Sequence, residues 1–489
     1  MNEKLNDQTE IRIDKLHQLV EQGINPFSNN FKPKDVVKDL INTYGDKSRD
    51  ELSEINKQFV VAGRITSKRD FGKSIFFHLK DRTGKIQGFI QRDTVGADNL
   101  KFFKKFVDVG DFIGLTGNLF KTKTEELTVN VNEYTFLTKS LRPLPEKWHG
   151  LQDVELRYRQ RYLDLISNEQ VKDIFLKRNR IVKLIKNYLD EREFIEVETP
   201  ILHTIAGGAA AKPFVTHHNA LDMDLFLRIA PELYLKRLVV GGLERVYELG
   251  RTFRNEGIST KHNPEFTMVE FYQAYATYED LMSLIEEMIS GICREICGQE
   301  IIVYQDKEIN FKTPWKRINI NDALSEKYGK ELLENENEIF KKAKSLGIEH
   351  NNIKGKAIAE IFELEIGEKL VHPTFVYAFP LDVSPLARKN DKNSDITDRF
   401  ELYINGWEIA NAFSELNDPV DQKERFKKQL ENKAKGDEES HENDDDFITA
   451  LEYGMPPTAG AGIGIDRLVM LLTNSSSIRE VIFFPHLKP

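Results

Sequence analysis

Residues 248–272 read ELGRTFRNEGISTKHNPEFTMVEFY, two runs of alternating residues around a loop rich in Gly, Asn and Pro. This pattern predicts two strands joined by a long loop. A side-chain period of two puts Arg254 and Glu256 on one face of the first strand. On the returning strand it groups four side chains on one face: Phe266, Met268, Glu270 and Tyr272. One sheet surface then offers a guanidinium for a phosphate or carboxylate, an aromatic ring to cover a flat ring, and an anion beside a hydroxyl. A surface ladder of ion pairs is the alternative interpretation.

A second hairpin is predicted downstream, in residues 399–415 (RFELYINGWEIANAFSE), because Asn-Gly at 405–406 is the strongest two-residue turn signal. In the resulting register Glu401 and Glu408 are diagonal neighbours, with backbones about 7–8 Å apart. Two converging carboxylates suit Mg²⁺, which takes few protein carboxylates together with substrate phosphates. The same count puts Asn411 on the opposite face, unless the strand bulges or ends just before it.

A glycine-rich stretch in residues 458–472 (TAGAGIGIDRLVMLL) leads into an apolar helix with Arg467 in its first turns. Spare backbone N–H groups and an arginine at a helix start favour a phosphate. The glycines do not fit G-x-G-x-x-G after a strand, and the chain has no G-x-x-x-x-G-K-[ST] sequence. Rossmann and P-loop folds are therefore disfavoured.

The front of the chain predicts a small β-barrel. Five short strands are expected at 59–65, 74–80, 84–92, 111–120 and 126–137, with a helix at 97–107 after the third. This is the plan of a five-stranded OB-fold, which commonly binds oligonucleotides. An SH3-like barrel stays open on strand count.

One face of the second barrel strand has the character of a nucleic-acid site. Alternation turns Ile75, Phe77 and Leu79 inward, and it leaves Phe76 outward among polar and basic groups. Residues 60–92 hold eight basic and two acidic side chains. An outward aromatic ring flanked by cations is typical of a platform on which a base stacks.

The net charge of the whole chain hides a difference in charge between its front part and the remainder. The 489 residues carry a formal net charge of −10, but residues 1–150 carry +4 and the remainder −14. A basic front part ahead of an acidic body indicates a polyanion-binding module joined to a second domain.

Two domains are predicted, residues 1–145 and 146–489, with a proline-containing linker at 141–145. Beyond it, an amphipathic helix at 171–191 precedes strands and helices without βαβ regularity, which predicts an α+β domain with an antiparallel sheet flanked by helices. The highly charged segment 431–446 is expected to be a solvated loop.

Composition favours a globular protein of the cytoplasm. The chain is 40% hydrophobic and 30% charged, and it has two cysteines. So few cysteines argue against a disulfide framework and fit a reducing compartment. Because no run approaches the roughly 18 apolar residues of a membrane span, we expect no membrane contact.

Taken in order, these segments resemble the three signature motifs of class II aminoacyl-tRNA synthetases: the helix running into FIEVETPIL (194–202), then FRNEG with HNPEFTMVEFY, then GAGIGIDRL. Further segments resemble the lysyl-tRNA synthetase family within that class: GGAAAKPF (207–214), RIAPELYLKRL (228–238), FSELNDP (413–419) and LEYGMPPTAG (451–460). The resemblance runs from about residue 59 to the end.

The resemblance implies an anticodon-binding OB-fold, a class II catalytic domain and a homodimer formed partly through the first motif. The expected partners are ATP, L-lysine and lysine tRNA. Arg254 would hold the α-phosphate and the substrate carboxylate, and Arg467 would grip the triphosphate, as the catalytic residues. The resemblance further assigns ATP contacts to Glu256 and His262, adenine stacking to Phe266, and Mg²⁺ to Glu401 and Glu408.

The other site residues are also implied by the resemblance. Gly208 and Glu232 match positions that meet the lysine α-amino group, and Asn411 matches one near its carboxylate. The ε-ammonium pocket is matched by Glu270, Tyr272 and Glu415. The anticodon contacts are matched by Arg69, Phe76, Gln87 and Glu126.

Three alternatives are weighed against this interpretation. The first is an aspartate or asparagine enzyme of the same class, but an aspartate pocket would need cations facing the substrate side chain, whereas Glu270 and Glu415 are anions. Relatives that lysylate a protein resemble the catalytic domain without a barrel. A non-catalytic RNA-binding protein would have no need to keep the phosphate-binding arginines and the paired glutamates.

Overall fold

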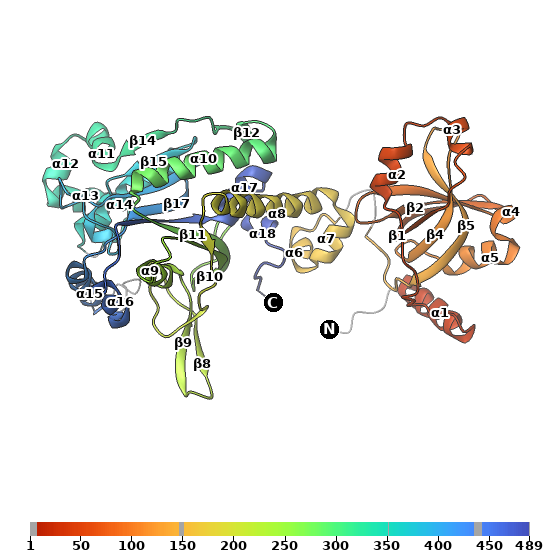
Figure 1. Ribbon diagram of the computed structural model, residues 1–489, viewed down its shortest axis with the longest axis horizontal. Helices are drawn as coiled ribbons and strands as arrows, with labels where there is room; N and C mark the ends of the chain where they lie inside the picture. The colour runs from red at the N-terminus through yellow and green to blue at the C-terminus, as the bar shows by residue number, and fades with distance from the viewer. Residues whose placement is uncertain (1–6, 146–150, 351, 435–442, 489) are drawn as a thin grey trace. The chain divides into compact units, whose positions relative to one another are not determined.

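The computed structural model describes residues 7–145, 151–350, 352–434 and 443–488 (Figure 1). It forms two compact units, Met1–Leu151 and Gln152–Pro489. The boundary predicted after residue 145 adjoins residues 146–150, which lie outside the described residues.

The first unit is a closed five-stranded barrel with the strand order β1-β2-β3-β5-β4. Its strands are β1 (Phe59–Asp70), β2 (Ser74–Lys80), β3 (Lys85–Gln91), β4 (Phe112–Lys121) and β5 (Leu127–Thr138). Its helices are α1 (Asp7–Glu21), α2 (Val37–Tyr44), α3 (Arg49–Ser53), α4 (Arg92–Val95) and α5 (Ala97–Phe106). The predicted OB-fold is confirmed, including the helix between the third and fourth strands.

Side chains of β2 alternate between the inside and the outside of the barrel as predicted. Ile75, Phe77 and Leu79 are at most 1% exposed and fill the barrel. Phe76 faces outward, where its ring lies 4.5 Å from that of Phe89 on β3. The strand therefore supports a core on one side and an aromatic surface on the other.

The second unit is built on an eight-stranded sheet with the order β14-β15-β16-β17-β18-β11-β10-β6. The strands are β6 (Ile195–Glu196), β10 (Arg245–Phe253), β11 (Glu265–Ala274), β14 (Lys316–Asn319), β15 (Thr374–Tyr377), β16 (Arg399–Ile404), β17 (Trp407–Ser414) and β18 (Thr458–Gly464). Neighbours are antiparallel except β14 with β15 and β10 with β6. The predicted α+β architecture with an antiparallel sheet is confirmed.

Helices α8 (Glu169–Asp190), α10 (Tyr278–Cys297) and α17 (Ile465–Thr473) pack with one face of this sheet to form the main core (Figure 1). Val269 and Phe271 of β11 belong to this core and are fully buried. Because side chains alternate along a strand, the residues between them face the other side of the sheet.

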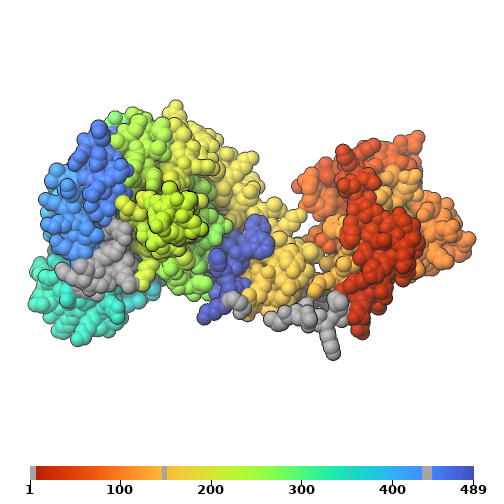
Figure 2. All heavy atoms as spheres, turned by 90° about the horizontal axis from the view of Figure 1, so that it is seen from below, coloured from red at the N-terminus to blue at the C-terminus, as the bar shows by residue number. Residues whose placement is uncertain are grey.

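Further elements surround the sheet. The helices are α6 (Val154–Arg159), α7 (Arg161–Ser167), α9 (Glu232–Val240), α11 (Ile320–Tyr328), α12 (Glu331–Glu334), α13 (Glu336–Ser345), α14 (Lys354–Glu365), α15 (Pro419–Ala434), α16 (Asp445–Glu452) and α18 (Ile478–Val481). The short strands are β7 (Leu202–His203), β8 (Val215–His218), β9 (Met223–Leu227), β12 (Ile301–Tyr304) and β13 (Lys307–Asn310). The β8–β9 hairpin projects from the unit (Figure 1) and stands out as a yellow-green bulge from below (Figure 2).

The charged segment 431–446 is not a single loop in the described residues. Its start continues α15 to Ala434 and its end begins α16 at Asp445, while residues 435–442 lie outside the described residues. None of the described helices has the combined length and apolar character needed to cross a membrane.

Two local predictions were wrong. The glycine-rich stretch before Arg467 is strand β18, whose backbone pairs with β11 and β17, so its N–H groups are not spare for a phosphate. Strand β10 ends at Phe253, so Arg254 and Glu256 follow the strand and do not lie on it. The N–H of Arg254 instead donates to the carbonyl of Pro264 across the loop (2.9 Å).

The β16–β17 hairpin corrects the predicted register. A two-residue turn would pair Ile404 with Trp407, Tyr403 with Glu408 and Leu402 with Ile409. The structure has the first two pairs, but Leu402 faces Ala410. Ile409 is thus the extra residue of a bulge, which reverses the phase of the strand beyond it. The bulge brings Asn411 opposite Glu401, on the face to which the regular register did not assign it.

Candidate active site

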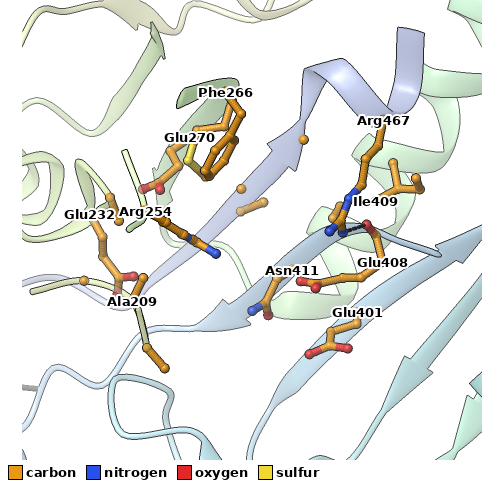
Figure 3. Close-up of a pocket in the computed structure, with 18 of the residues that line it drawn as sticks. Ala209, Glu232, Arg254, Phe266, Glu270, Glu401, Glu408, Ile409, Asn411 and Arg467 are labelled. Atoms are coloured by element: carbon orange, nitrogen blue, oxygen red, sulfur yellow. Dashed lines mark hydrogen bonds between the residues drawn. The ribbon is translucent and has the colours of Figure 1, made fainter. Parts of the chain in front are cut away.

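A cavity of about 380 Å³ lies on the sheet face opposite the main core. Strand β11 and the loop that precedes it supply one wall, and β16, β17 and β18 supply the floor (Figure 3). The predicted residues that line it are Gly208, Glu232, Arg254, Glu256, His262, Phe266, Glu270, Tyr272, Glu401, Glu408, Asn411 and Arg467. Glu415 does not line the cavity itself. Its carboxylate lies against Gly460 and Tyr272, and both of these residues line the cavity.

Two arginines approach the cavity from different elements (Figure 3). The guanidinium of Arg254 lies 5.3 Å from the ring centroid of Phe266, and its Nε has no hydrogen-bond partner among the described residues. Arg467 lies in the first turn of α17. The residue before it, Asp466, fixes this turn in place by accepting from the N–H of Thr267 (2.6 Å) and by pairing with Arg178 (2.6 Å). A buried donor without a partner is expensive, so the orientation of Arg254 favours an anionic ligand.

His262 is held neutral between these elements. Arg467 Nη2 lies 2.9 Å from His262 Nε2, and Ser259 Oγ lies 2.8 Å from Nδ1. A guanidinium can only donate, so Nε2 accepts and Nδ1 carries the proton. Burial first, and then the charge of Arg467, lower the pKa of His262, in agreement with this tautomer.

Glu401 and Glu408 form an acidic pair on the hairpin. Glu401 is 8% exposed and accepts from Arg399 Nη2 (2.6 Å) and from the Tyr403 hydroxyl (2.9 Å). Burial, followed by the charge of Glu408, raises the pKa of Glu401 to about 7. Two repelling carboxylates that line the same cavity as Arg254 and Arg467 fit Mg²⁺, which needs few protein oxygens when substrate phosphates supply the rest.

Three further carboxylates gather at one end of the cavity. Glu232, Glu270 and Glu415 are 6%, 5% and 2% exposed. Glu270 accepts a hydrogen bond from the Tyr272 hydroxyl (3.2 Å) but forms no ion pair within the described part of the chain. Burial is the main cause that raises the pKa of Glu270 to about 8, and the charge of Glu232 adds to it. A buried carboxylate without a paired cation is costly, so this end favours a cationic ligand.

Glycines allow this cluster to form. A Cβ on Gly460 would lie 2.3 Å from both Glu415 Oε1 and Tyr272 Cε1, so only glycine lets these two side chains meet across β18. Gly208 has φ +90°, and a Cβ there would lie 3.1 Å from Glu232 Cβ. Its backbone therefore passes close over Glu232.

The predicted anticodon residues also lie together on the barrel. Arg69 pairs with Phe76 across β1 and β2, and Gln87 on β3 donates from Nε2 to Glu126 Oε2 (2.8 Å). Glu126 is also held by His78 Nε2 (2.9 Å). The surface thus combines an aromatic ring with an ordered polar network.

With this geometry established, the chain can be compared with known proteins. The family described as "tRNA synthetases class II (D, K and N)" matches residues 153–488. The chain belongs to this family. An "OB-fold nucleic acid binding domain" of the anticodon-binding type matches residues 59–137.

Curated relatives of this class II synthetase cover the whole chain. One from Bacillus cytotoxicus is 52% identical over 493 residues, spanning 100% of this chain and 98% of its own length. One from Carboxydothermus hydrogenoformans is 53% identical over 492 residues, spanning 100% and 99%. Both are named lysine–tRNA ligase.

Two cations that pair with the carboxylates of this synthetase's cavity were not predicted from the sequence. Arg399 donates to Glu401, to Asn411 Oδ1 (3.1 Å) and to Ser384 Oγ (3.0 Å), and so connects the acidic pair to Asn411. Lys236 is fully buried between Glu232 and Glu415. The i, i+4 spacing of Glu232 and Lys236 was a possible signal, but that spacing also occurs in exposed helix pairs.

Proposed function

We propose that this synthetase is a lysine–tRNA ligase. It joins L-lysine to the α-phosphate of ATP, releases pyrophosphate, and transfers the lysyl group from the adenylate to the 3′ end of lysine tRNA. The observation that carries the proposal is Glu270, a carboxylate that is 5% exposed and has no ion-pair partner among the described residues.

The charge of Glu232, Glu270 and Glu415 at one end of the cavity selects the side chain of the amino-acid substrate. A lysine ε-ammonium satisfies Glu270, with the Tyr272 hydroxyl and Glu415 beside it. Glu232, next to the backbone of Gly208, receives the α-ammonium. An aspartate side chain would instead place an acceptor among acceptors, and an asparagine side chain would bring no positive charge, so the carboxylates would remain uncompensated.

Nucleotide binding is assigned to the opposite part of the cavity. Phe266 covers adenine, and Glu256 and the neutral His262 contact ATP. Arg467 holds the triphosphate. Glu401 and Glu408 would hold Mg²⁺, which supplies charge neutralisation at the phosphates when bound.

The chemistry needs positioning more than a base. The lysine carboxylate is already an anion at neutral pH. One of its oxygens forms a bond to the α-phosphorus, the bond from that phosphorus to the bridging oxygen breaks, and pyrophosphate leaves. In this proposal Arg254 contacts both the carboxylate and the α-phosphate, and Asn411 orients the carboxylate, so the two anions are held together as the new bond forms.

In this proposal the barrel binds the anticodon of the tRNA. An unstacked uridine-rich loop offers base faces to Phe76 and base edges to Gln87, Glu126 and Arg69. The positive charge of residues 60–92 favours the phosphate backbone.

A homodimer in the cytoplasm completes the proposal. Strand β6 is an edge of the main sheet, and Ile195, Ile201 and Leu202 near it are 45–49% exposed. Exposed apolar side chains along a sheet edge suit a second copy of the chain. The low cysteine content favours a reducing compartment.

The test is ATP–pyrophosphate exchange without tRNA, measured with a panel of amino acids. We expect exchange with lysine, and a loss of at least about 10²–10³-fold in Arg254→Ala, as for loss of a transition-state donor. Arg251→Ala is the matched control, because Arg251 lies on β10 three residues before Arg254 and forms only a partly exposed pair with Glu265 (3.5 Å). Exchange with aspartate and not with lysine would overturn the assignment.

A further inference from the structure

Lys236 is a fully buried cation that the mechanism above does not use. It lies one helical turn after Glu232 on α9, and its Nζ is 2.7 Å from Glu232 Oε1. The same Nζ pairs with Glu415, which follows the end of β17. The rings of Phe413 and Phe447 lie 5.4 and 5.9 Å from it. Lys236 thus connects two carboxylates that come from different elements.

The charges at this end of the cavity can be counted. Glu232, Glu270 and Glu415 contribute three carboxylates, and Lys236 contributes one ammonium. Free lysine brings two more ammonium groups. Three carboxylates then face three ammonium groups, and no buried charge is left without a counter-charge.

We propose that Lys236 is a positioning residue for amino-acid selection: it supplies the third cation and holds Glu232 and Glu415 where the two substrate ammonium groups meet them. This inference rests on the proposed lysine activation. Met at this position would fill the same volume without the charge, so the variant separates electrostatics from packing.

The groups that face these carboxylates determine the pH dependence. Burial raises the pKa of Glu232 and of Glu415, and the Lys236 ammonium opposes this effect in both. The other facing groups are Arg399 toward Glu232, and Tyr272, Arg254 and Arg228 toward Glu270. Without Lys236, Glu232 and Glu415 would keep their protons to higher pH. Protonated carboxyls attract ammonium groups weakly. As the pH is lowered, the variant would therefore lose lysine binding at a higher pH than the wild type does.

The experiment measures kcat/KM for lysine in ATP–pyrophosphate exchange from pH 6 to 9, in the wild type, Lys236→Met and Lys236→Arg. We expect the acidic limb of the Lys236→Met profile to move up by about one pH unit or more. At pH 7 its lysine KM should rise at least about 10-fold, while the ATP KM stays within about twofold. Lys236→Arg keeps the charge and should restore the limb toward the wild type.

Each outcome decides the question. The proposal would be overturned if folded Lys236→Met had the same acidic limb of lysine kcat/KM as the wild type. Equal increases in the KM for lysine and the KM for ATP would also overturn it. If Lys236→Met does not fold, Lys236→Gln takes its place, because the neutral amide can still donate to Glu232 and Glu415, and we expect the same upward shift of its acidic limb. Failure of both neutral variants to fold would assign Lys236 to the stability of the fold and overturn its role in selection. Absence of lysine exchange in the wild type would instead reject the proposed function itself.

Discussion

Asn411 lies directly opposite Glu401 across the β16–β17 hairpin, because Ile409 is an extra residue in β17. Arg399 joins the two by donating to Asn411 Oδ1 (3.1 Å) and to Glu401 Oε1 (2.6 Å). The bulge therefore puts the group proposed to meet the lysine carboxylate next to the group proposed to meet the metal. The reacting carboxylate and the nucleotide phosphates would converge there.

Asn411→Ala tests this convergence. Loss of one amide that is proposed to contact the lysine carboxylate should cost about 1–3 kcal/mol, or about 5–150-fold in lysine kcat/KM. The ATP KM should change little, because Asn411 is assigned to the amino acid. Exchange kinetics at varied lysine and at varied ATP measure both quantities. Equal effects on the two substrates would contradict the assignment.

Gly460→Ala tests the packing of the carboxylate end. The new Cβ would lie 2.3 Å from Glu415 Oε1 and from Tyr272 Cε1, so both side chains must shift. We expect lysine KM to rise at least about 10-fold, in keeping with the cost of overpacking. Gly291→Ala on α10 is the control, since its Cβ would meet only Arg294 Nη2 at 3.8 Å. An unchanged lysine KM in folded Gly460→Ala would count against this pocket.

Glu270 gives a pH dependence with a definite sign. Its pKa is raised to about 8, so at pH 7 it is mostly protonated in the protein without lysine. The proton must leave before the carboxylate can pair with an ammonium, so lysine affinity should increase as pH rises from 6 to 8. Calorimetry in two buffers of different ionisation enthalpy should detect release of about one proton per lysine bound at pH 7. Glu270→Gln should bind lysine weakly without releasing this proton. The same proton release in the variant would show that another group is responsible.

Phe76→Ala separates the two units. Loss of one stacking ring should cost about 1–3 kcal/mol, or about 5–150-fold in kcat/KM for tRNA charging. Pyrophosphate exchange without tRNA should be unaffected. Phe27→Ala is the matched control in the same unit, because Phe27 is 53% exposed and is not on the stacking surface. Equal losses of charging and exchange in Phe76→Ala would refute the division of labour.

Much of this arrangement could be predicted from local patterns. Period two identified Phe76 as an outward ring and grouped Phe266, Glu270 and Tyr272 on one face, because alternation is a property of any strand. The Asn-Gly turn predicted that Glu401 and Glu408 converge.

Other features depend on contacts between distant segments. The bulge at Ile409 follows from packing against β16 and β18, and no residue type marks it in advance. Lys236 is buried because Glu415, about 180 positions later, reaches its ammonium. Gly460 lies in a strand and not in a phosphate loop, and its small size matters because Tyr272 and Glu415 meet beside it.

The central claim is that buried carboxylates select an ammonium side chain. The most direct measurement compares exchange kcat/KM for lysine with that for norleucine, which has the same carbon chain without the ε-ammonium. Because Glu270 would be left without a cation, we predict a preference for lysine of at least about 10⁴-fold. Exchange with norleucine or aspartate as efficient as exchange with lysine would contradict the account.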